Sequence, residues 1–289
     1  MSTIAIHGPG VFRTSCYGTR IHHKFRRISS SWKMTMNSNS SQTRKTQEFS
    51  IDLQKVSIPQ FETASPSHLQ FDRLQPSEQE LIQENRLEFG QFVAREVVLD
   101  EEFWTAAWLR AESQWENGTN GRYVDNYKRK FAEQEFNALK RRSKGKLGQK
   151  CTCIVTVKKE EGNVKHTVLK SVVGTLDLSI RYLLHGETFP QERVKAPLLC
   201  SIKRAGKTPY GYIANLCVAK SARRQRIASN MLHFAIDSAK SNGAEQVFVH
   251  VYRNNIPAQE LYQKMGFEMV EMASPQLSQE KTFLLRFKT

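Results

Sequence analysis

The sequence predicts an α/β fold in which a mixed central sheet is flanked by helices. Apolar runs of strand length alternate along the chain with longer segments whose apolar residues recur at helical spacing. The order strand, polar turn, helix occurs twice between residues 210 and 267. With 289 residues, 39% of them hydrophobic and 25% charged, the chain is long enough to bury a full core.

A basic leader opens the chain. Residues 1–47 contain eight Lys and Arg residues and no Asp or Glu, and they are rich in Ser and Thr. This composition is typical of an organelle transit peptide, and plastid import fits it better than mitochondrial import. A disordered basic tail is the plain alternative. We expect residues 1–65 to be transit peptide and disordered linker, and residues 66–289 to form the folded domain.

The formal net charge of +15 does not by itself indicate a nucleic-acid-binding protein. Without the leader, 35 basic residues stand against 28 acidic ones, a modest +7. Aromatic and basic residues do not interleave as they do in single-strand platforms, so nucleic acid is not an expected partner. No run of eighteen apolar residues exists, and no membrane span is expected.

Metal and disulfide chemistry are not expected either. The chain has five cysteines and no C-x-x-C pair, so no ligand set of zinc-site spacing is present. The cysteines are Cys16, Cys151, Cys153, Cys200 and Cys217.

Before residue 143 we expect helices over 77–88, 101–116 and 123–142, and a strand over 92–99. Ser77 and Glu80 form a capping box, which marks the start of the first helix. Asp100 is expected to cap the second helix, along which three tryptophans and an alanine form an apolar stripe. A stripe at this spacing predicts core packing. Its members are Trp104, Trp108, Ala111 and Trp115.

The middle of the chain favours strands. Cys151–Val157 and Val168–Ile180 are expected to pair as a hairpin. Residues 181–209 contain three prolines, which indicates an irregular insertion. Apolar and polar residues alternate well enough over 281–288 to predict the strand that closes the sheet. The complete expected order is β-α-α-β-β-β-α-β-α-β-β.

Residues 210–231 carry the strongest chemical signal. An apolar strand, Tyr212–Val218, leads into the basic turn Lys220–Arg226. Apolar residues at helical spacing then predict a helix from about Arg224. The first amide hydrogens of a helix have no internal partner and lie at the positive end of its dipole. We therefore expect this turn to bind a phosphate group.

A second motif follows it. A strand over 246–251 leads into a helix that Asn255 caps and Gly266 ends. Together the two motifs resemble the GNAT superfamily of acetyl-CoA-dependent N-acetyltransferases, over about residues 90–289. The family pattern N-x-x-A-x-x-L-Y-x-x-x-G-F is matched in full from Asn255 to Phe267. The pattern R/Q-x-x-G-x-G/A is matched at Arg223 and Ala228, with Arg226 in the place of a glycine.

The resemblance implies the GNAT fold, in which the fourth and fifth strands splay apart, and acetyl-CoA as co-substrate without a metal. The implied cofactor-binding positions are Leu216, Cys217, Val218, Ala219, Lys220, Arg223, Arg224, Gln225, Arg226, Ile227, Ala228, Ser229, Asn255 and Tyr262. Arg226 is the departure from the family, because glycine lets the backbone approach the phosphate closely. If Arg226 keeps ordinary helical dihedrals, its amide can still donate to the phosphate.

The catalytic roles also rest on resemblance. Tyr262 stands where the family has the general acid that protonates the leaving thiolate. Tyr212 and His250 have offsets similar to the tyrosine–histidine pair of certain protein N-terminal acetyltransferases, which holds the water that removes the amine proton. The glutamate of histone-type members is absent between Tyr210 and Val218. A core role for His250 is the alternative, and the identity of the base stays open.

The overall resemblance is to the plant plastid branch. It implies direct acetylation of protein N-terminal α-amines and lysine ε-amines, with protein or peptide amines as partners; the oligomeric state stays open. One alternative is a small-amine, polyamine-type acetyltransferase, although residues 181–209 hold two acidic against six basic residues. The other is a degenerate, non-catalytic acyl-CoA-binding protein, because Arg226 replaces the motif glycine.

Overall fold

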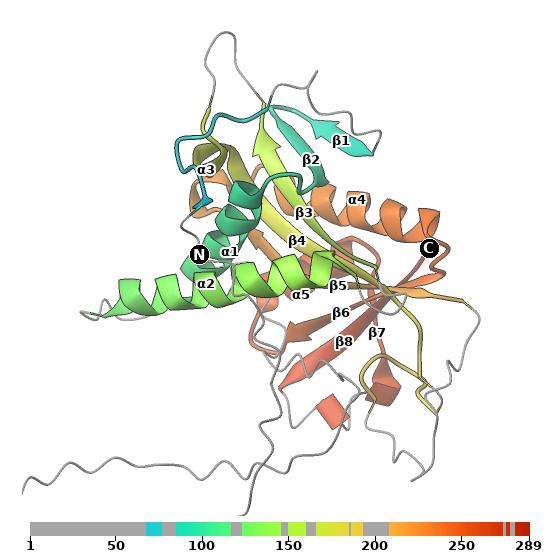
Figure 1. Ribbon diagram of the computed structural model, residues 1–289. Helices are drawn as coiled ribbons and strands as arrows, with labels where there is room; N and C mark the ends of the chain where they lie inside the picture. The colour runs from blue at the N-terminus through green and yellow to red at the C-terminus, as the bar shows by residue number, and fades with distance from the viewer. Residues whose placement is uncertain are drawn as a thin grey trace, which may run out of the picture. The chain divides into compact units, whose positions relative to one another are not determined.

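Eight strands form one mixed sheet in the computed structural model (Figure 1). The model describes residues 68–76, 85–116, 123–145, 150–159, 166–184, 186–192, 208–273, 276–277 and 281–289, so the expected leader and linker lie outside the described residues. The strands are β1 (Arg86–Phe89), β2 (Phe92–Glu96), β3 (Lys150–Lys158), β4 (Val172–Arg181), β5 (Tyr210–Val218), β6 (Gln246–Tyr252), β7 (Glu268–Met269) and β8 (Thr282–Lys288).

The strand order across the sheet is β1-β2-β3-β4-β5-β6-β8-β7. Every neighbouring pair is antiparallel except β5 and β6, which are parallel and are joined through a helix. A parallel pair needs such a crossover connection. The predicted mixed sheet is therefore confirmed, with its one parallel pair in the middle.

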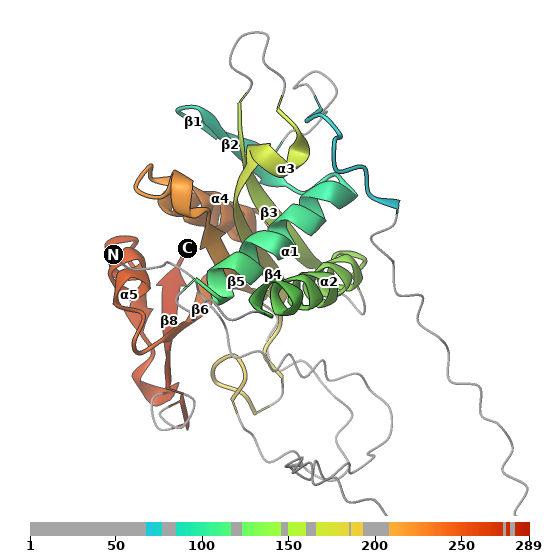
Figure 2. The ribbon, with the colours of Figure 1, turned by 90° about the vertical axis from the view of Figure 1, so that its left-hand side faces the viewer.

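Helices cover both faces of the sheet (Figure 2). They are α1 (Asp100–Gln114), α2 (Val124–Ser143), α3 (Val168–Ser171), α4 (Ile227–Ser241) and α5 (Ile256–Lys264). The apolar faces of α1 and α2 pack on β2 and β3 in one core cluster, whereas α4 and α5 pack on the opposite face against β5 and β6. The helix predicted over 123–142 is confirmed within two residues at each end.

The helix predicted over 77–88 is wrong at its end. Residues 77–84 lie outside the described residues, but Arg86–Phe89 is strand β1. Gly90, with φ of +52°, turns the chain, and β1 then pairs with β2 from Phe89↔Phe92 to Arg86↔Arg95. Leu87 and Phe89 alternate with charged residues and pack on the core, so strand pairing outweighs the local capping signal.

Two boundaries also differ from the prediction. Val168–Ser171 is a helical turn rather than the start of the long strand, and the Ser171 hydroxyl donates to the carbonyl of Val168 at 3.0 Å. Asp100 does not cap α1. The carboxylate of Glu102, in the first turn, instead accepts the amide hydrogens of Val98 at 2.9 Å and Leu99 at 3.3 Å.

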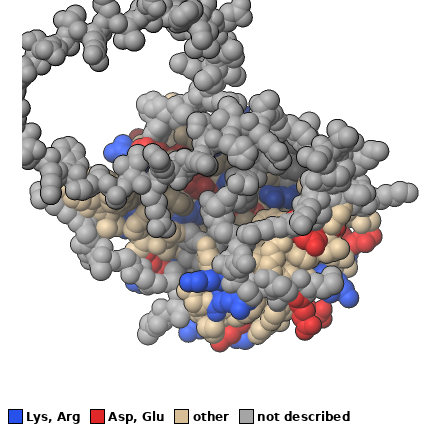
Figure 3. Space-filling model, turned by 90° about the horizontal axis from the view of Figure 1, so that it is seen from below, with Lys and Arg blue, Asp and Glu red and all other residues tan. Residues whose placement is uncertain are grey.

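None of the described helices is long and apolar enough to cross a bilayer. On the face seen from below, acidic and basic side chains are interspersed over the described part (Figure 3). In the same part of the chain, no three His, Cys, Asp or Glu side chains gather as a metal site.

Candidate active site

The centre of the sheet opens between β5 and β6. The two strands pair only from Gly211↔Val247 to Ile213↔Val249, and β5 continues to Val218 without a further partner in β6. The splay expected of the fourth and fifth strands is thus present. Leu216 and Val218 turn their side chains into the core beneath α4, so only backbone groups of this stretch remain for a ligand.

Near this opening, Tyr262 on α5 has a buried hydroxyl group. Its side chain is fully buried, and its hydroxyl has no hydrogen-bond partner among the described residues. Burial raises the pKa of this phenol well above its ordinary value, and the neighbouring Tyr212 and Cys217 raise it further. Asn255 caps α5 as predicted, because its carboxamide oxygen accepts the amide hydrogen of Ala258 at 3.3 Å.

Tyr212 and His250 meet on the opposite face of the sheet from α4. They come from the adjacent strands β5 and β6, and the Tyr212 hydroxyl lies 2.8 Å from His250 Nδ1. Both side chains are buried. The guanidinium of Arg181, at the end of β4, lies 5.1 Å from the centre of the Tyr212 ring. The structure therefore brings together the two residues that the sequence offset had paired.

The basic turn after β5 keeps the backbone of a glycine-containing turn. Lys220–Ala222 forms a single 3-10 turn and α4 begins at Ile227, three residues after the predicted start. Arg226 has φ of +57° and ψ of 13°, so the condition of ordinary helical dihedrals is not met and the residue is left-handed. Arg224 is also left-handed, with φ of +68°. Both side chains are exposed.

The left-handed backbone at Arg226 should make replacement by glycine stabilising. For an L-residue this conformation costs about 1–2 kcal/mol, whereas glycine loses about 0.5–1 kcal/mol of additional backbone entropy. Arg226→Gly should therefore raise the free energy of unfolding by up to about 1 kcal/mol, measured by urea denaturation. Arg226→Ala removes the same guanidinium but keeps Cβ, so it should give no gain. Equal effects of the two substitutions would contradict the strain.

The guanidinium of Arg223 is engaged by Glu116 and by the carbonyl of Val218. Its two terminal nitrogens donate to both carboxylate oxygens of Glu116, at 2.8 and 2.6 Å, and its Nε donates to the carbonyl of Val218 at 3.2 Å. A bidentate pair of this kind fixes geometry as well as charge. Arg223 thus ties the turn to Glu116, two residues after the end of α1. The sequence analysis had not singled out Glu116.

The tryptophan stripe divides between core and groove. Trp104 is buried and packs at 5.8 Å, edge to face, on Phe136 of α2, which confirms its predicted core role. Trp108 is half-buried and lines, with Trp104, a groove of about 870 Å³ that reaches Ala219 and Ser221 after β5. Its described lining residues include neither Tyr262 nor His250, but they include Ala219, one of the implied cofactor-binding positions.

The sequence matches a known protein family. Residues 101–267, more than half of the chain, match the model of the Acetyltransferase (GNAT) family. The chain belongs to the GNAT acetyltransferase family. It is an enzyme of the N-acetyltransferase class, and the two motifs at Arg223–Ala228 and Asn255–Phe267 lie within the matched region or at its end.

Relatives from plants are similar over most of the chain. The "GCN5-related N-acetyltransferase 6, chloroplastic" of Arabidopsis thaliana is 60% identical over 289 residues, 99% of each chain. The "GCN5-related N-acetyltransferase 7, chloroplastic" of the same plant is 29% identical and covers 64% of this GNAT chain and 69% of its own. The name of the first relative confirms the predicted plastid location.

Among solved structures, the PaiA N-acetyltransferase from Thermoplasma acidophilum in complex with coenzyme A is similar to this GNAT chain at 14% identity. The match has a TM-score of 0.43 and covers 69% of this chain and 100% of that one.

Sequence reasoning missed a buried set of charged side chains beside β5. The set consists of Arg110, Glu135, Arg142 and Asp177, with Asn215 at its edge. The sequence does indicate these buried charges: Asp177 interrupts the apolar run of β4, and Arg110 lies between the apolar residues Leu109 and Ala111. A charge at a core position needs a partner, and such charges can be paired with each other.

Proposed function

We propose that this protein is a plastid acetyl-CoA-dependent N-acetyltransferase that transfers acetyl directly to protein N-terminal α-amines and lysine ε-amines. The observation that carries the proposal is the Tyr262 hydroxyl, fully buried and without a partner among the described residues. A buried donor is costly unless it serves a bound group. It lies close enough to Tyr212 and Cys217 on β5 for both to affect its pKa.

The residues around the splay fit acetyl-CoA. Backbone groups of β5 after Ile213 have no ladder partner in β6, and they are suited to the amide groups of a pantetheine arm. The left-handed turn at Arg224 and Arg226 supports a pyrophosphate site over the amides from Arg223 to Ser229. Arg226 is exposed, so its side chain does not fill that turn. The bound thioester supplies the activated acetyl group.

Two proton positions complete the proposed chemistry. Tyr262 holds the proton that the departing sulfur needs, and its raised pKa keeps it protonated across the neutral range. On the acceptor side, we assign to Tyr212 and His250, whose hydroxyl and Nδ1 lie 2.8 Å apart, the removal of a proton from the amine through water. One proton leaves the amine and one reaches the sulfur, so the transfer is balanced.

Direct transfer is supported by the state of the described cysteines. Burial raises the pKa of Cys217, on β5, to about 11. Burial also raises the pKa of Cys151 and Cys153 above the ordinary thiol value. A cysteine nucleophile acts as the thiolate, which these groups do not form at neutral pH. An acyl-enzyme on these thiols is therefore disfavoured.

The experiment supplies the purified protein with acetyl-CoA, a peptide pool with free N-termini and lysines, and a polyamine in a parallel reaction. We expect acetylated α-amines and lysines in the peptides by mass spectrometry, and little product from the polyamine. Product only from the polyamine would identify a small-amine enzyme. Calorimetric binding of acetyl-CoA without turnover would identify a non-catalytic acyl-CoA-binding protein. Either result contradicts the proposal.

His250→Ala should lower kcat/KM for N-terminal peptides about tenfold at pH 7, because without a base only the deprotonated fraction of the α-amine, about a tenth, can react. An α-amine has a pKa of about 8, so at pH 9 the substrate is already deprotonated and the defect should shrink. His233, exposed on α4, provides the matched control, and His233→Ala should have no effect. A defect of equal size at both pH values would assign His250 a structural role.

A further inference from the structure

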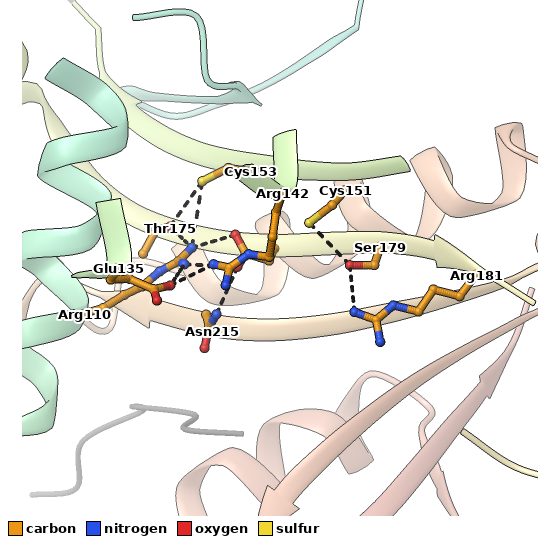
Figure 4. A network of polar contacts seen from close by, with 10 residues as sticks. Arg110, Glu135, Arg142, Cys151, Cys153, Thr175, Ser179, Arg181 and Asn215 are labelled. Carbon is orange, nitrogen blue, oxygen red and sulfur yellow. Dashed lines mark hydrogen bonds and ion pairs between the residues drawn. The ribbon is translucent and has the colours of Figure 1, made fainter. Parts of the chain in front are cut away.

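A buried cluster of charged side chains lies beside β5 (Figure 4). Arg110, from α1, donates to both carboxylate oxygens of Asp177 on β4, at 3.0 and 2.8 Å, and to the hydroxyl of Thr175 at 2.7 Å. The side chains of Arg110 and Asp177 are 3% and 4% exposed. Glu135 and Arg142 from α2 complete the cluster, whose four formal charges cancel.

Arg110 holds the two residues of β4 that flank a bulge in β5. In the ladder between the strands, Thr175 pairs with Cys217 and Asp177 pairs with Ala214, so two residues of β5 face the single Leu176. A bulge of this kind bends its strand and increases its twist. The parallel pairing of β5 with β6 ends at Ile213, two residues before Asn215 in the bulge.

Asn215 is the bulged residue, and Asp177 holds it. Its φ of +54° is left-handed, a conformation that asparagine tolerates better than most residues but not without strain. The Asn215 carboxamide nitrogen donates to Asp177 Oδ2 at 2.9 Å. Burial opposes ionisation of Asp177, but the charges of Arg110 and Arg142 outweigh it and keep the pKa of this carboxyl below its ordinary value. Asn215 therefore meets a carboxylate.

We propose that Asp177 is a positioning residue which, held by Arg110, fixes Asn215 at the bulge and thereby sets the direction of the β5 backbone that acetyl-CoA meets. The inference rests on the proposed function and deepens it, because Asp177 acts through the backbone of Leu216 to Val218 rather than on the reacting atoms. It also ties α1 and α2 to the same stretch of β5.

The physical cost of the cluster favours this role over simple stabilisation. Taking the Arg110–Asp177 pair out of water is expensive, and the side chains of Glu135 and Arg142 are only 17% and 18% exposed. Well-packed apolar side chains of similar volume are often as stable or more so. What apolar residues cannot provide is a directed acceptor for Asn215. We therefore attribute the cluster to fixing the backbone conformation at Asn215.

Asn215→Gly tests the inference with little disturbance of the backbone, because glycine adopts positive φ readily. Loss of the hydrogen bond to a carboxylate should raise KM and Kd for acetyl-CoA about tenfold and leave KM for the peptide nearly unchanged. Lys281→Gly is the matched control: Lys281 is exposed, precedes β8 and also has a positive φ, of 56°. It should leave acetyl-CoA binding at the wild-type value.

An exchange of the two side chains tests the contact itself. Asn215→Asp sets one carboxylate against another and should weaken acetyl-CoA binding more than Asn215→Gly does. Adding Asp177→Asn restores an amide–carboxylate hydrogen bond with the roles exchanged, and should recover binding to within about threefold of wild type. Wild-type binding by Asn215→Gly, or no recovery in the exchanged protein, would overturn the inference.

A measurement on the free protein separates this inference from the proposed function. Hydrogen exchange at the amides of Leu216 to Val218 should be faster in Asn215→Gly than in wild type, without any ligand. If the wild-type protein binds no acetyl-CoA, the proposed function fails, while the exchange rates still decide whether Asp177 and Asn215 fix this stretch. Unchanged exchange rates would refute the positioning role.

Discussion

Tyr262→Phe should lower kcat about a hundredfold and change KM for acetyl-CoA little. The substitution removes one hydroxyl and keeps the ring, which packs at 5.2 Å on Phe267. Loss of a general acid costs about 10²–10⁴ in rate. Because the hydroxyl has no partner among the described residues, its removal should also raise the free energy of unfolding by about 1 kcal/mol. Lower activity with higher stability is the expected signature.

The pH dependence of the wild-type rate gives a second test of the same residue. Burial raises the pKa of Tyr262 well above the ordinary phenol value of 10.0, so the acid form persists throughout the working range. We expect kcat to show no alkaline decline below pH 10. A decline with an apparent pKa near 8 or 9, lost in Tyr262→Phe, would show that the phenol titrates early and contradict its burial.

Tyr252→Phe is the matched control, since Tyr252 on β6 is half-buried and loses the same hydroxyl. Its kcat should stay within about twofold of wild type. Retention of wild-type kcat by Tyr262→Phe would withdraw the role of general acid and leave Tyr262 as a core residue of α5.

The sequence was informative where local signals and tertiary packing agree. The strand, turn and helix from Tyr210 to Ser241 follow directly from apolar periodicity, and so does the Asn255 cap of α5. The pairing of Tyr212 with His250 was expected only because their offsets are similar to a known tyrosine–histidine pair. In the ladder Tyr212 lies opposite Phe248, two residues before His250. These features depend on residues close together in the chain or on a familiar motif.

Prediction failed where distant contacts decide the local structure. The capping box at Ser77 favoured a helix that would run to Glu88, but pairing with β2 makes Arg86–Phe89 a strand. Arg226 is left-handed although its residue type disfavours that conformation, and no local sequence pattern indicates it. Arg110 and Asp177 are 67 residues apart, so no window of the sequence shows that they pair.

Glu102→Gln should lower the free energy of unfolding by about 3–5 kcal/mol, the usual cost of breaking a buried ion pair by removing one partner. Glu102 is fully buried beside Arg95, which donates to it through both terminal nitrogens. Gln75 donates to it as well, at 2.9 Å, and the amides of Val98 and Leu99 complete its partners. The substitution leaves the guanidinium of Arg95 buried without a countercharge.

The loss should depend on pH in a defined direction. Burial opposes ionisation of Glu102, but the hydrogen bonds and charge of Arg95 outweigh it and lower its pKa below the ordinary 4.5. A carboxyl with a lowered pKa stabilises the fold above its unfolded-state value, and this contribution disappears as the pH falls towards the folded-state value. Wild type should therefore lose stability below about pH 4.5 more steeply than Glu102→Gln.

Glu112→Gln separates this ion pair from a general effect of removing a carboxylate from α1. Glu112 lies on the same helix but is exposed, so its substitution should change the free energy of unfolding by less than about 0.5 kcal/mol. Arg110 on α1 and Glu116 just after α1 contact β4 and the turn after β5. We therefore expect loss of the ion pair at Glu102 to affect the site only when α1 unfolds. The folded fraction of Glu102→Gln should accordingly keep wild-type kcat/KM, and a loss per folded molecule would show that Glu102 acts on the site itself.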